Sequence, residues 1–344
     1  MDFLCTSPGL RPNKIWCHFS DMEIAQFVSL HQTTYYFRFF LVVKKKSFTS
    51  SVLGHEALLL LTSIIWGLAF VAQRAGMESI GPFAFNGIRF ILGSLSLLPL
   101  ILFLKSKPKP NGQIRLNPLI AGLISGIILF IAASLQQVGM VYTTASNGGF
   151  ITSLYVIIVP LLGLLAGERL NTQTWIGAVL AVVGLYLLSV RSGFSINPGD
   201  LLVLASALFW AIHLIIIGYY SNKTDVLLLA AIQFAVTGVL SLAVSAISEQ
   251  TQLSQVVEAG IPILYGGLMS VGVAYTLQIV GQRKALPAHA AIILSLEALF
   301  AAIGGWIILH EKLSLQQIAG GLLMLAGLIV AQLHFKSKTS RPNT

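Results

Sequence analysis

The most informative shortage in this sequence is of charge. Asp, Glu, Lys and Arg make up only 10% of its 344 residues, and 56% are hydrophobic, whereas soluble domains carry about 25% charged residues. Because a water-facing surface needs charged groups, this balance indicates that lipid is the main solvent. A helix needs roughly 20 apolar residues to cross a hydrocarbon core about 30 Å thick. The chain after residue 52 has room for ten such helices.

Cysteine is almost missing as well. The two cysteines, Cys5 and Cys17, both lie near the N-terminus. They support neither a disulfide framework nor a metal site. We therefore expect no metal and no other cofactor.

A basic surface of the kind that binds nucleic acid is also missing, although the formal net charge is +9. The Lys and Arg residues lie in short loops and tails between apolar runs, where they orient a chain in the membrane. A basic stripe interleaved with aromatic stacking residues is absent. The partners that we expect are a small-molecule substrate and membrane lipid, with no nucleic acid; a homodimer is compatible with the sequence.

Residue patterns for catalysis are lacking too. The sequence holds no P-loop pattern Gly-x4-Gly-Lys-Ser/Thr, and its apolar runs contain no aspartate. An intramembrane enzyme would need two aspartates, a Ser/His arrangement or a His-Glu-x-x-His motif, and the pair His310-Glu311 lacks the second histidine. We expect no catalytic residue, no enzyme activity, and a source of energy in gradients.

What the chain does contain is a regular series of apolar runs. Connectors with helix-breaking residues separate them, among them Gly81-Pro82, Asn197-Pro198-Gly199 and Pro287. The sequence therefore predicts an all-α membrane protein with ten transmembrane helices. The expected ranges are 57–73, 82–104, 119–140, 145–166, 174–190, 201–220, 226–247, 261–281, 288–309 and 315–333.

Residues 1–52 do not share this pattern. The run from Tyr35 to Val43 is interrupted by Arg38 and is too short to span a bilayer. It also lacks the charge placement and the cleavage site of a signal peptide. A membrane-surface anchor or regulatory tail is one interpretation, and a poorly ordered extension, which we favour, is the other. Residues 335–344 are expected to form a cytoplasmic tail.

The orientation follows from the basic residues in the loops. Counted from Lys44 onward, the loops and tails on the side of the N-terminus carry 14 Lys and Arg, against three, Arg74, Arg191 and Lys312, on the other side. Without Lys44-Lys45-Lys46 the ratio is still 11 to three. Because basic loops stay in the cytoplasm, we expect a multi-pass protein of the plasma or inner membrane with both termini cytoplasmic.

The chain also resembles itself at a spacing near 143 residues. Thr152-Ser153-Leu154 lies over Ser295-Leu296-Glu297, and Gly167-Glu168-Arg169-Leu170 lies over His310-Glu311-Lys312-Leu313. Two domains follow, 53–190 and 198–334, of five helices each. An odd number of helices makes the second half enter the membrane from the opposite face, so the repeats are inverted. At shifts of 144 and 142 residues, Trp66 falls on Trp210, Arg89 on Gln233 and Gln136 on Gln278.

The paired Gly-Glu-Arg-Leu and His-Glu-Lys-Leu turns, together with Trp66-Gly67, Ile88-Arg89-Phe90 and the segment from Ala288 to Trp306, resemble the two EamA domains of the drug/metabolite transporter superfamily. The resemblance covers residues 56–334. It implies ten helices, cytoplasmic termini, and export or exchange of small solutes such as amino acids. Many members carry a proline after the glutamate of the ninth helix, where this chain has Ala298; we therefore expect that helix to be straighter.

Glu297 is the first candidate for a functional residue. An ionisable side chain at the centre of a membrane helix costs about 2.5–3.5 kcal/mol on insertion scales, and Glu297 is the tenth residue of its predicted helix. It is a candidate proton carrier or a partner for a cationic substrate group. The alternative is a structural carboxyl group that bonds to a neighbouring helix.

Arg89 is the second candidate, a third of the way into its predicted helix. Its guanidinium is suited to clamping a carboxylate or phosphate group of a substrate. The alternative is a side chain that snorkels to the interface or pairs with a helix end. Its repeat mate Gln233 is also polar, which indicates that both positions face protein or water.

Further candidates are polar or aromatic residues on otherwise apolar helices. Such groups either line a wet cavity or bond between helices, at about 0.6 kcal/mol each. Trp66 and Trp210 are included because they lie mid-helix, away from the interfacial belts that tryptophan prefers. The remaining members are Gln136, Asn147, Tyr155, His213 and Gln278.

The function that we predict is a secondary transporter, an exporter or exchanger of small metabolites, which works by alternating access around a midplane cavity. A non-transporting membrane sensor or scaffold, or an intramembrane enzyme, are the alternatives. The substrate, the direction of transport and the choice between proton coupling and exchange stay open at this level.

Overall fold

The computed structural model describes residues 52–103, 116–165, 167, 170–189, 198–308 and 314–332. From Ser51 onward the chain forms one compact unit. The predicted N-terminal extension up to residue 51 and the predicted tail at 335–344 lie outside the described residues. So do the turns at Glu168-Arg169 and Glu311-Lys312.

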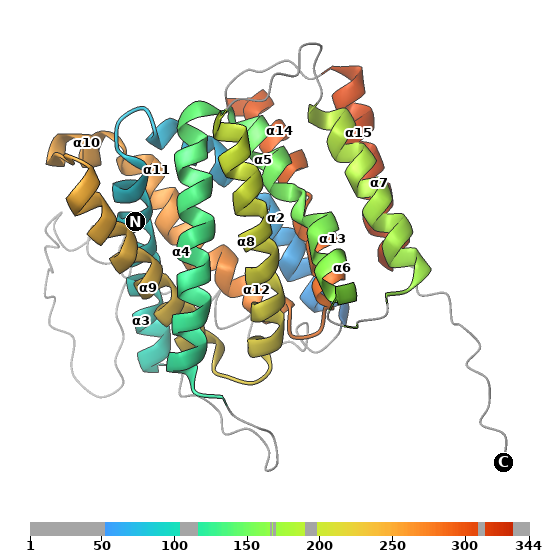
Figure 1. Ribbon diagram of the computed structural model, residues 1–344, viewed down its shortest axis with the longest axis horizontal. Coiled ribbons are helices and arrows are strands. Elements are labelled where there is room, and N and C mark those ends of the chain that lie inside the picture. Colours follow the sequence, from blue (N-terminus) through green and yellow to red (C-terminus); the bar gives the residue numbers. More distant parts are fainter. Residues whose placement is uncertain are drawn as a thin grey trace, which may run out of the picture. The chain divides into compact units, whose positions relative to one another are not determined.

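The described chain is all helical, and each of the ten predicted helices is present (Figure 1). Eight described segments are long and apolar enough to cross a membrane, and two shorter apolar helices complete the set, which confirms the predicted fold class. The short helix α10 (Leu253–Glu258) was not predicted. In chain order the spans are α2 (Val52–Gly76), α3 (Pro82–Phe103), α4 (Pro118–Tyr142), α5 (Ala145–Ser153) with α6 (Tyr155–Leu165), α7 (Thr172–Ser189), α8 (Pro198–Ser221), α9 (Val226–Ser248), α11 (Gly260–Leu264) with η2 (Tyr265–Tyr275) and α12 (Thr276–Gly281), α13 (Pro287–Leu294) with α14 (Glu297–Ile308), and α15 (Leu315–Gln332).

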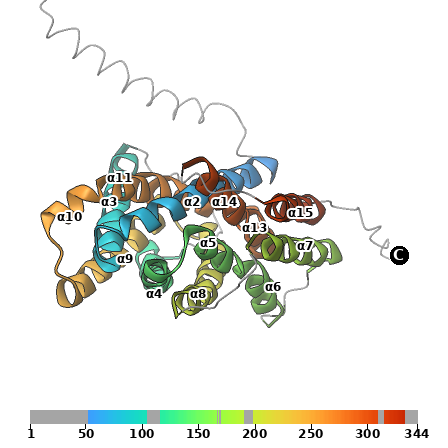
Figure 2. The same ribbon diagram turned by 90° about the horizontal axis from the view of Figure 1, so that it is seen from above.

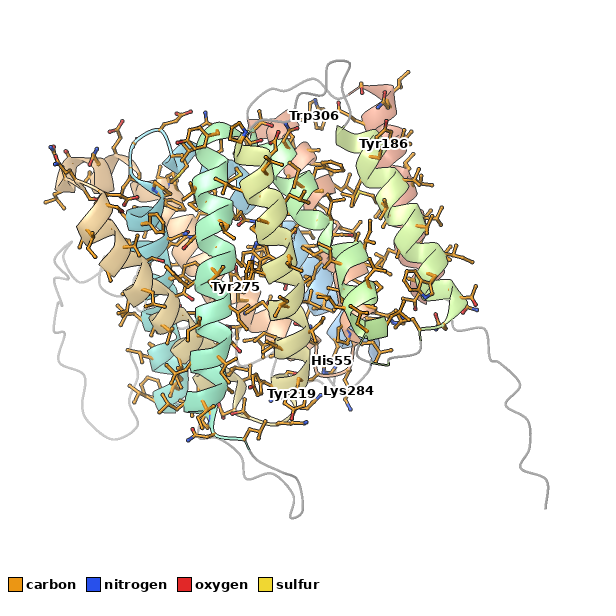
Figure 3. The ribbon with its side chains drawn as sticks, in the orientation of Figure 1. His55, Tyr186, Tyr219, Tyr275, Lys284 and Trp306 are labelled. Atoms are coloured by element: carbon orange, nitrogen blue, oxygen red, sulfur yellow. The ribbon has the colours of Figure 1, made fainter. Side chains whose placement is uncertain are left out.

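The outer surface of the bundle has the character of a lipid-facing surface. Leu102, Leu165 and Ile247 expose 77 to 90% of their side-chain surface, and exposed apolar area on this scale is rare on soluble monomers. Aromatic side chains lie at both ends of the bundle: Trp306 at one end and Tyr219 at the other (Figure 3). Aromatic residues favour the two membrane–water interfaces.

Local sequence explains where the helices begin. Pro82, Pro118 and Pro287 each occupy the first position of a helix, where proline loses no hydrogen bond. The side chain of Asp225 accepts from the backbone N–H groups of the first turn of α9 at 3.0 Å. The start of α3 is capped from a distant segment, because Glu249 accepts from its backbone at 2.8 and 2.9 Å.

The helices pack in pairs that respect the internal repeat. Helix α7 packs on its repeat mate α15, and α3 packs on its mate α9; both views place α7 beside α15 (Figures 1 and 2). Helix α4 packs on α8, and their repeat mates pack in the same way, η2 and α12 on α2. Close approach of α7 and α15 depends on Gly177, where a Cβ atom would lie 2.7 Å from the carbonyl oxygen of Gly327.

Three of the spans are interrupted or distorted near their middle. The fourth span breaks at Leu154 and the ninth at Ser295 and Leu296, which are equivalent places in the two repeats. The eighth span contains the π-helix η2 over 11 residues. All three irregular segments supply residues to the interior of the bundle.

The expectation that Ala298 leaves the ninth helix straighter is wrong. The break arises without proline. The N–H groups of Leu296 and Ala298 bond to the carbonyls of Ile293 and Ser295, each three residues back, at 3.3 and 3.2 Å. These tightened turns replace the α-helical register between α13 and α14.

Candidate functional site

A cavity of about 370 Å³ lies between the two repeats at mid-bundle. Tyr275, one of its walls, lies about half-way between the two ends of the bundle (Figure 3). The lining residues come from α2 (Trp66, Phe70, Gln73), α3 (Arg89), α4 (Gln136), α5 (Thr152), α6 (Tyr155), α8 (Trp210), η2 (Ser270, Tyr275) and α14 (Glu297).

Six of the ten predicted site residues line this cavity. They are Trp66, Arg89, Gln136, Tyr155, Trp210 and Glu297. Four others do not line it: Asn147, which is half-buried in the first turn of α5, and Gln233, His213 and Gln278, which are buried beside it.

Arg89 is the one buried cation on the described cavity wall, and its side chain does not extend to the interface. Its Nε donates to Asn86 at 3.0 Å, and Asn86 in turn donates to the carbonyl of Ala133 at 3.0 Å. The guanidinium lies over the rings of Phe85 and Phe90, at 5.2 and 5.1 Å from their centroids. Among the described residues no carboxylate lies within ion-pair distance of it. These contacts hold the guanidinium in place and leave its charge uncompensated.

Glu297 lies in the first turn of α14, directly after the break in the ninth span, and is buried. The hydroxyl of Ser153, from the equivalent break in the fourth span, donates to its Oε1 at the long distance of 3.5 Å. The Tyr155 side chain lines the cavity on the same side. Within the described part of the chain, neither Arg89 nor another basic side chain forms an ion pair with this carboxyl group.

Aromatic rings form the floor of the cavity. The ring of Tyr275 stacks on Trp210, with centroids 6.0 Å apart and 26° between planes, and meets Trp66 edge-on at 4.6 Å. The indole of Trp66 donates to the carbonyl oxygen of Ser270 at 3.3 Å. The indole N–H of Trp210 is buried without a partner, so one hydrogen-bond donor on the described wall is available to a ligand or water.

Amide side chains line the part of the cavity nearer the face on which α2 ends. Gln136 donates to the hydroxyl of Thr152 at 2.9 Å. The side-chain oxygen of Gln73 is buried with no partner. Buried polar atoms without partners are rare in native interiors, which indicates that water or a ligand occupies this space.

Five lining residues were missed by sequence reasoning: Phe70, Gln73, Thr152, Ser270 and Tyr275. Thr152 belongs to a repeated patch, and Gln73 is polar on an apolar helix, so both carried a usable signal. Ser270 and Tyr275 reach the cavity from the π-helix, for which hydrophobic periodicity contains no signal. In the described residues, no cluster of three His, Cys, Asp or Glu side chains exists that could hold a metal.

Comparison with known proteins identifies the family. The model of the EamA-like transporter family matches residues 55–190 and again 197–332. A protein of Archaeoglobus fulgidus described as an uncharacterized transporter is 34% identical over 276 residues, 80% of this chain and 84% of the relative. The inner membrane transporter YedA of Escherichia coli, also described as uncharacterized, is 25% identical over 281 residues, 78% of this chain and 87% of the relative.

The fold agrees with a solved structure. A crystal structure whose description names no function superimposes with a TM-score of 0.67 at 18% identity, over 83% of this chain and 99% of the other. Both family matches span five of the observed helical spans each. The chain therefore belongs to the EamA-like transporter family and is a multi-pass membrane transporter, not an enzyme.

Proposed function

We propose that this transporter is a secondary exporter of small metabolites that carry an anionic group, amino acids among them. The observation that carries the proposal is Arg89, a buried guanidinium on the cavity wall with no counter-ion among the described residues. A buried charge without a partner is costly by several kcal/mol. A carboxylate or phosphate group of a substrate would compensate it through paired hydrogen bonds.

Glu297 supplies the second function that a coupled transporter needs. Its carboxyl group is buried, faces the hydroxyl groups of Ser153 and Tyr155, and pairs with no basic side chain in the described part of the chain, so it can take up and release a proton as water enters and leaves the cavity. It can also bind an ammonium group of a substrate whose carboxylate lies on Arg89. Both uses place the coupling site and the substrate site in one cavity.

The mechanism that we propose is alternating access between two pseudo-equivalent halves. Inverted repeats around a midplane site are a recurrent transporter architecture, because the halves can exchange their shapes. The broken fourth and ninth spans and the π-helix of the eighth are the segments at which the halves would bend. By the loop charges, the N-terminus is cytoplasmic, and by likeness to the Escherichia coli relative, the membrane is the inner or plasma membrane.

The test is a metabolite export screen. Three cultures are grown in parallel: cells that express the chain, cells that express Arg89→Gln at a matched membrane level, and cells with an empty vector. The medium of each culture is analysed by mass spectrometry. The proposal expects one or more anionic or amphoteric metabolites to accumulate in the medium only with the unaltered chain. If the three media are the same, or if only cationic or uncharged solutes accumulate, the proposal fails.

A further inference from the structure

A second group of buried polar residues lies beside the cavity and is sealed from it. His213, Gln233, Gln278 and Gln282 are each at most 2% exposed. Nε2 of His213 bonds to Oε1 of Gln233 at 3.0 Å, and Gln282 donates to the carbonyl of Leu214 at 2.8 Å. Four further polar atoms of the group, Nδ1 of His213, Nε2 of Gln233 and Oε1 of both Gln278 and Gln282, have no partner among the described residues. Each such atom costs about 1–3 kcal/mol.

The repeat relates this buried group to residues that line the cavity. Arg89 is the eighth residue of α3 and Gln233 is the eighth residue of α9. Gln136 is the nineteenth residue of its span, Pro118–Tyr142, and Gln278 is the nineteenth of Gly260–Gly281. Because the repeats are inverted, two residues at the same position along equivalent spans lie nearer to opposite faces of the bundle. Arg89 and Gln136 lie toward the face on which α2 ends, and their mates lie toward the face on which α2 begins.

Two aromatic side chains of the cavity wall, Tyr275 and Trp210, lie against the ring of His213. Tyr275 forms part of the cavity wall, and its ring also meets the ring of His213 edge-on, with centroids 6.3 Å apart. It stacks on Trp210 and contacts Trp66, the pair of tryptophans that the repeat relates to each other. Next to Tyr275 in the chain, the carbonyl of Ala274 accepts from the hydroxyl of Thr62 in α2 at 3.2 Å.

We infer that His213, Gln233, Gln278 and Gln282 line the cytoplasmic half of the substrate pathway, closed in this structure, and that Tyr275 is the gate that closes it. This inference rests on the proposed function. In an inward-facing state, the second repeat takes the shape that the first has here. Water and the polar part of a small metabolite then satisfy the four orphaned amide and imidazole atoms, and the Arg89 side of the cavity closes.

The experiment uses the accessibility of single cysteines in the full-length chain. The two native cysteines are replaced, Cys5→Ser and Cys17→Ser, and cysteines are introduced by Gln233→Cys, Gln278→Cys and Gln136→Cys. Ile279→Cys is the matched control, because Ile279 adjoins Gln278 but is fully buried in an apolar cluster. The probe is the impermeant thiol reagent methanethiosulfonate ethyltrimethylammonium, applied to intact cells or to inside-out vesicles. Labelling after denaturation and gel filtration in detergent verify that every variant is present and folded.

The expected result is that Gln233→Cys and Gln278→Cys react from the cytoplasmic side several-fold faster than Ile279→Cys, while Gln136→Cys reacts from the outside. Adding Tyr275→Ala should raise the cytoplasmic rates further, whereas Tyr219→Ala, whose ring is exposed on the outside of the bundle, should not. The inference is overturned if the two glutamine positions react no faster than Ile279→Cys from the cytoplasm, or react only from the outside.

Metabolite export measured on the same cysteine-free chain separates this outcome from failure of the proposed function. If the chain exports metabolites but Gln233→Cys and Gln278→Cys do not react with the thiol reagent from the cytoplasmic side, the inference is overturned and the proposed function stands. Reactive cytoplasmic positions without export support the inference about the pathway and count against the proposed cargo.

Discussion

The two ionisable residues on the cavity wall differ in how firmly the protein holds them. Arg89 is fixed by a bond to Asn86 and by two aromatic rings, and cation–π contacts in a desolvated setting contribute about 2 kcal/mol each. The carboxyl group of Glu297 faces two neutral hydroxyl groups, that of Ser153 at the long distance of 3.5 Å and that of Tyr155. This difference fits the proposed division of labour, in which Arg89 positions the substrate and Glu297 changes protonation during the cycle.

Removing the charge of Arg89 should weaken substrate binding without unfolding the protein. In Arg89→Gln the residue becomes that of its repeat mate Gln233, which the fold accommodates at the equivalent depth of α9. A hydrogen bond to a charged group contributes about 1.5–3 kcal/mol, so we expect KM for an exported anionic metabolite to rise by about ten- to a hundredfold. Transport into inside-out vesicles measures KM, and Arg74→Gln, which removes a charge at the end of α2, is the control. An unchanged KM in Arg89→Gln would contradict the role of Arg89.

Replacing Glu297 by its neutral isostere should remove the effect of pH on transport. On the proposed mechanism, acid outside protonates Glu297 in the outward-facing state and drives export, so export by the unaltered chain should increase as the external pH falls. Glu297→Gln mimics the protonated form permanently, and we expect it to exchange substrate at a rate that no longer changes with pH. Counterflow in proteoliposomes at several pH values tests this, with Glu78→Gln, at an exposed position, as the control. A pH profile that survives in Glu297→Gln would exclude proton coupling through this residue.

At the scale of single elements, the ends of the helices follow from the sequence and their interruptions do not. The prediction 82–104 became Pro82–Phe103, and 119–140 became Pro118–Tyr142, because proline and polar loops mark the ends. The π-helix leaves the composition of its span apolar, so hydropathy does not reveal it. It shifts the hydrogen-bond register, and Ser270 and Tyr275 reach the cavity from it. The break at Ser295 was missed because we expected an interruption only from proline.

The start of α3 offers a test of an element that is held by a distant residue. Glu249 ends α9 and accepts two backbone hydrogen bonds from the first turn of α3. Loss of a helix cap costs about 0.5–2 kcal/mol, so Glu249→Ala should lower Tm in detergent by a few degrees. Glu258→Ala, an equal change of charge in the exposed helix α10, should leave Tm unchanged. Equal melting temperatures for the two variants would show that the cap contributes nothing.

At the scale of the whole molecule, the sequence revealed the repeat but not which of two repeat-related polar groups lines the cavity. The spacing of Trp66 and Trp210, and of Arg89 and Gln233, predicted two related halves. The structure adds that Arg89 lines a cavity while Gln233 is sealed. Two conformations of one sequence share the same pattern of residues, so no pattern could separate them. Six of the ten predicted residues gather in the cavity because a buried polar side chain in a membrane bundle needs either a partner or water.

The orientation of the bundle can be tested by the face at which its basic residues gather. Lys223 lies over the ring of Tyr219, and Arg283 bonds to the carbonyl of Ser221 at 3.0 Å. Lys284 lies at the same end as Tyr219 and as His55, near the start of α2 (Figure 3).

Because basic loops are retained in the cytoplasm, we predict that this face is cytoplasmic. Alkaline phosphatase, which is active only outside the cytoplasm, should be active when it is fused after Ser248 and inactive when it is fused after Ser221. Green fluorescent protein fused to the C-terminus should fluoresce. The reverse pattern would show the opposite orientation in the membrane. The proposed half-pathway of His213 and Gln233 would then lead to the outside. The repeat fixes the two half-pathways relative to each other in either orientation.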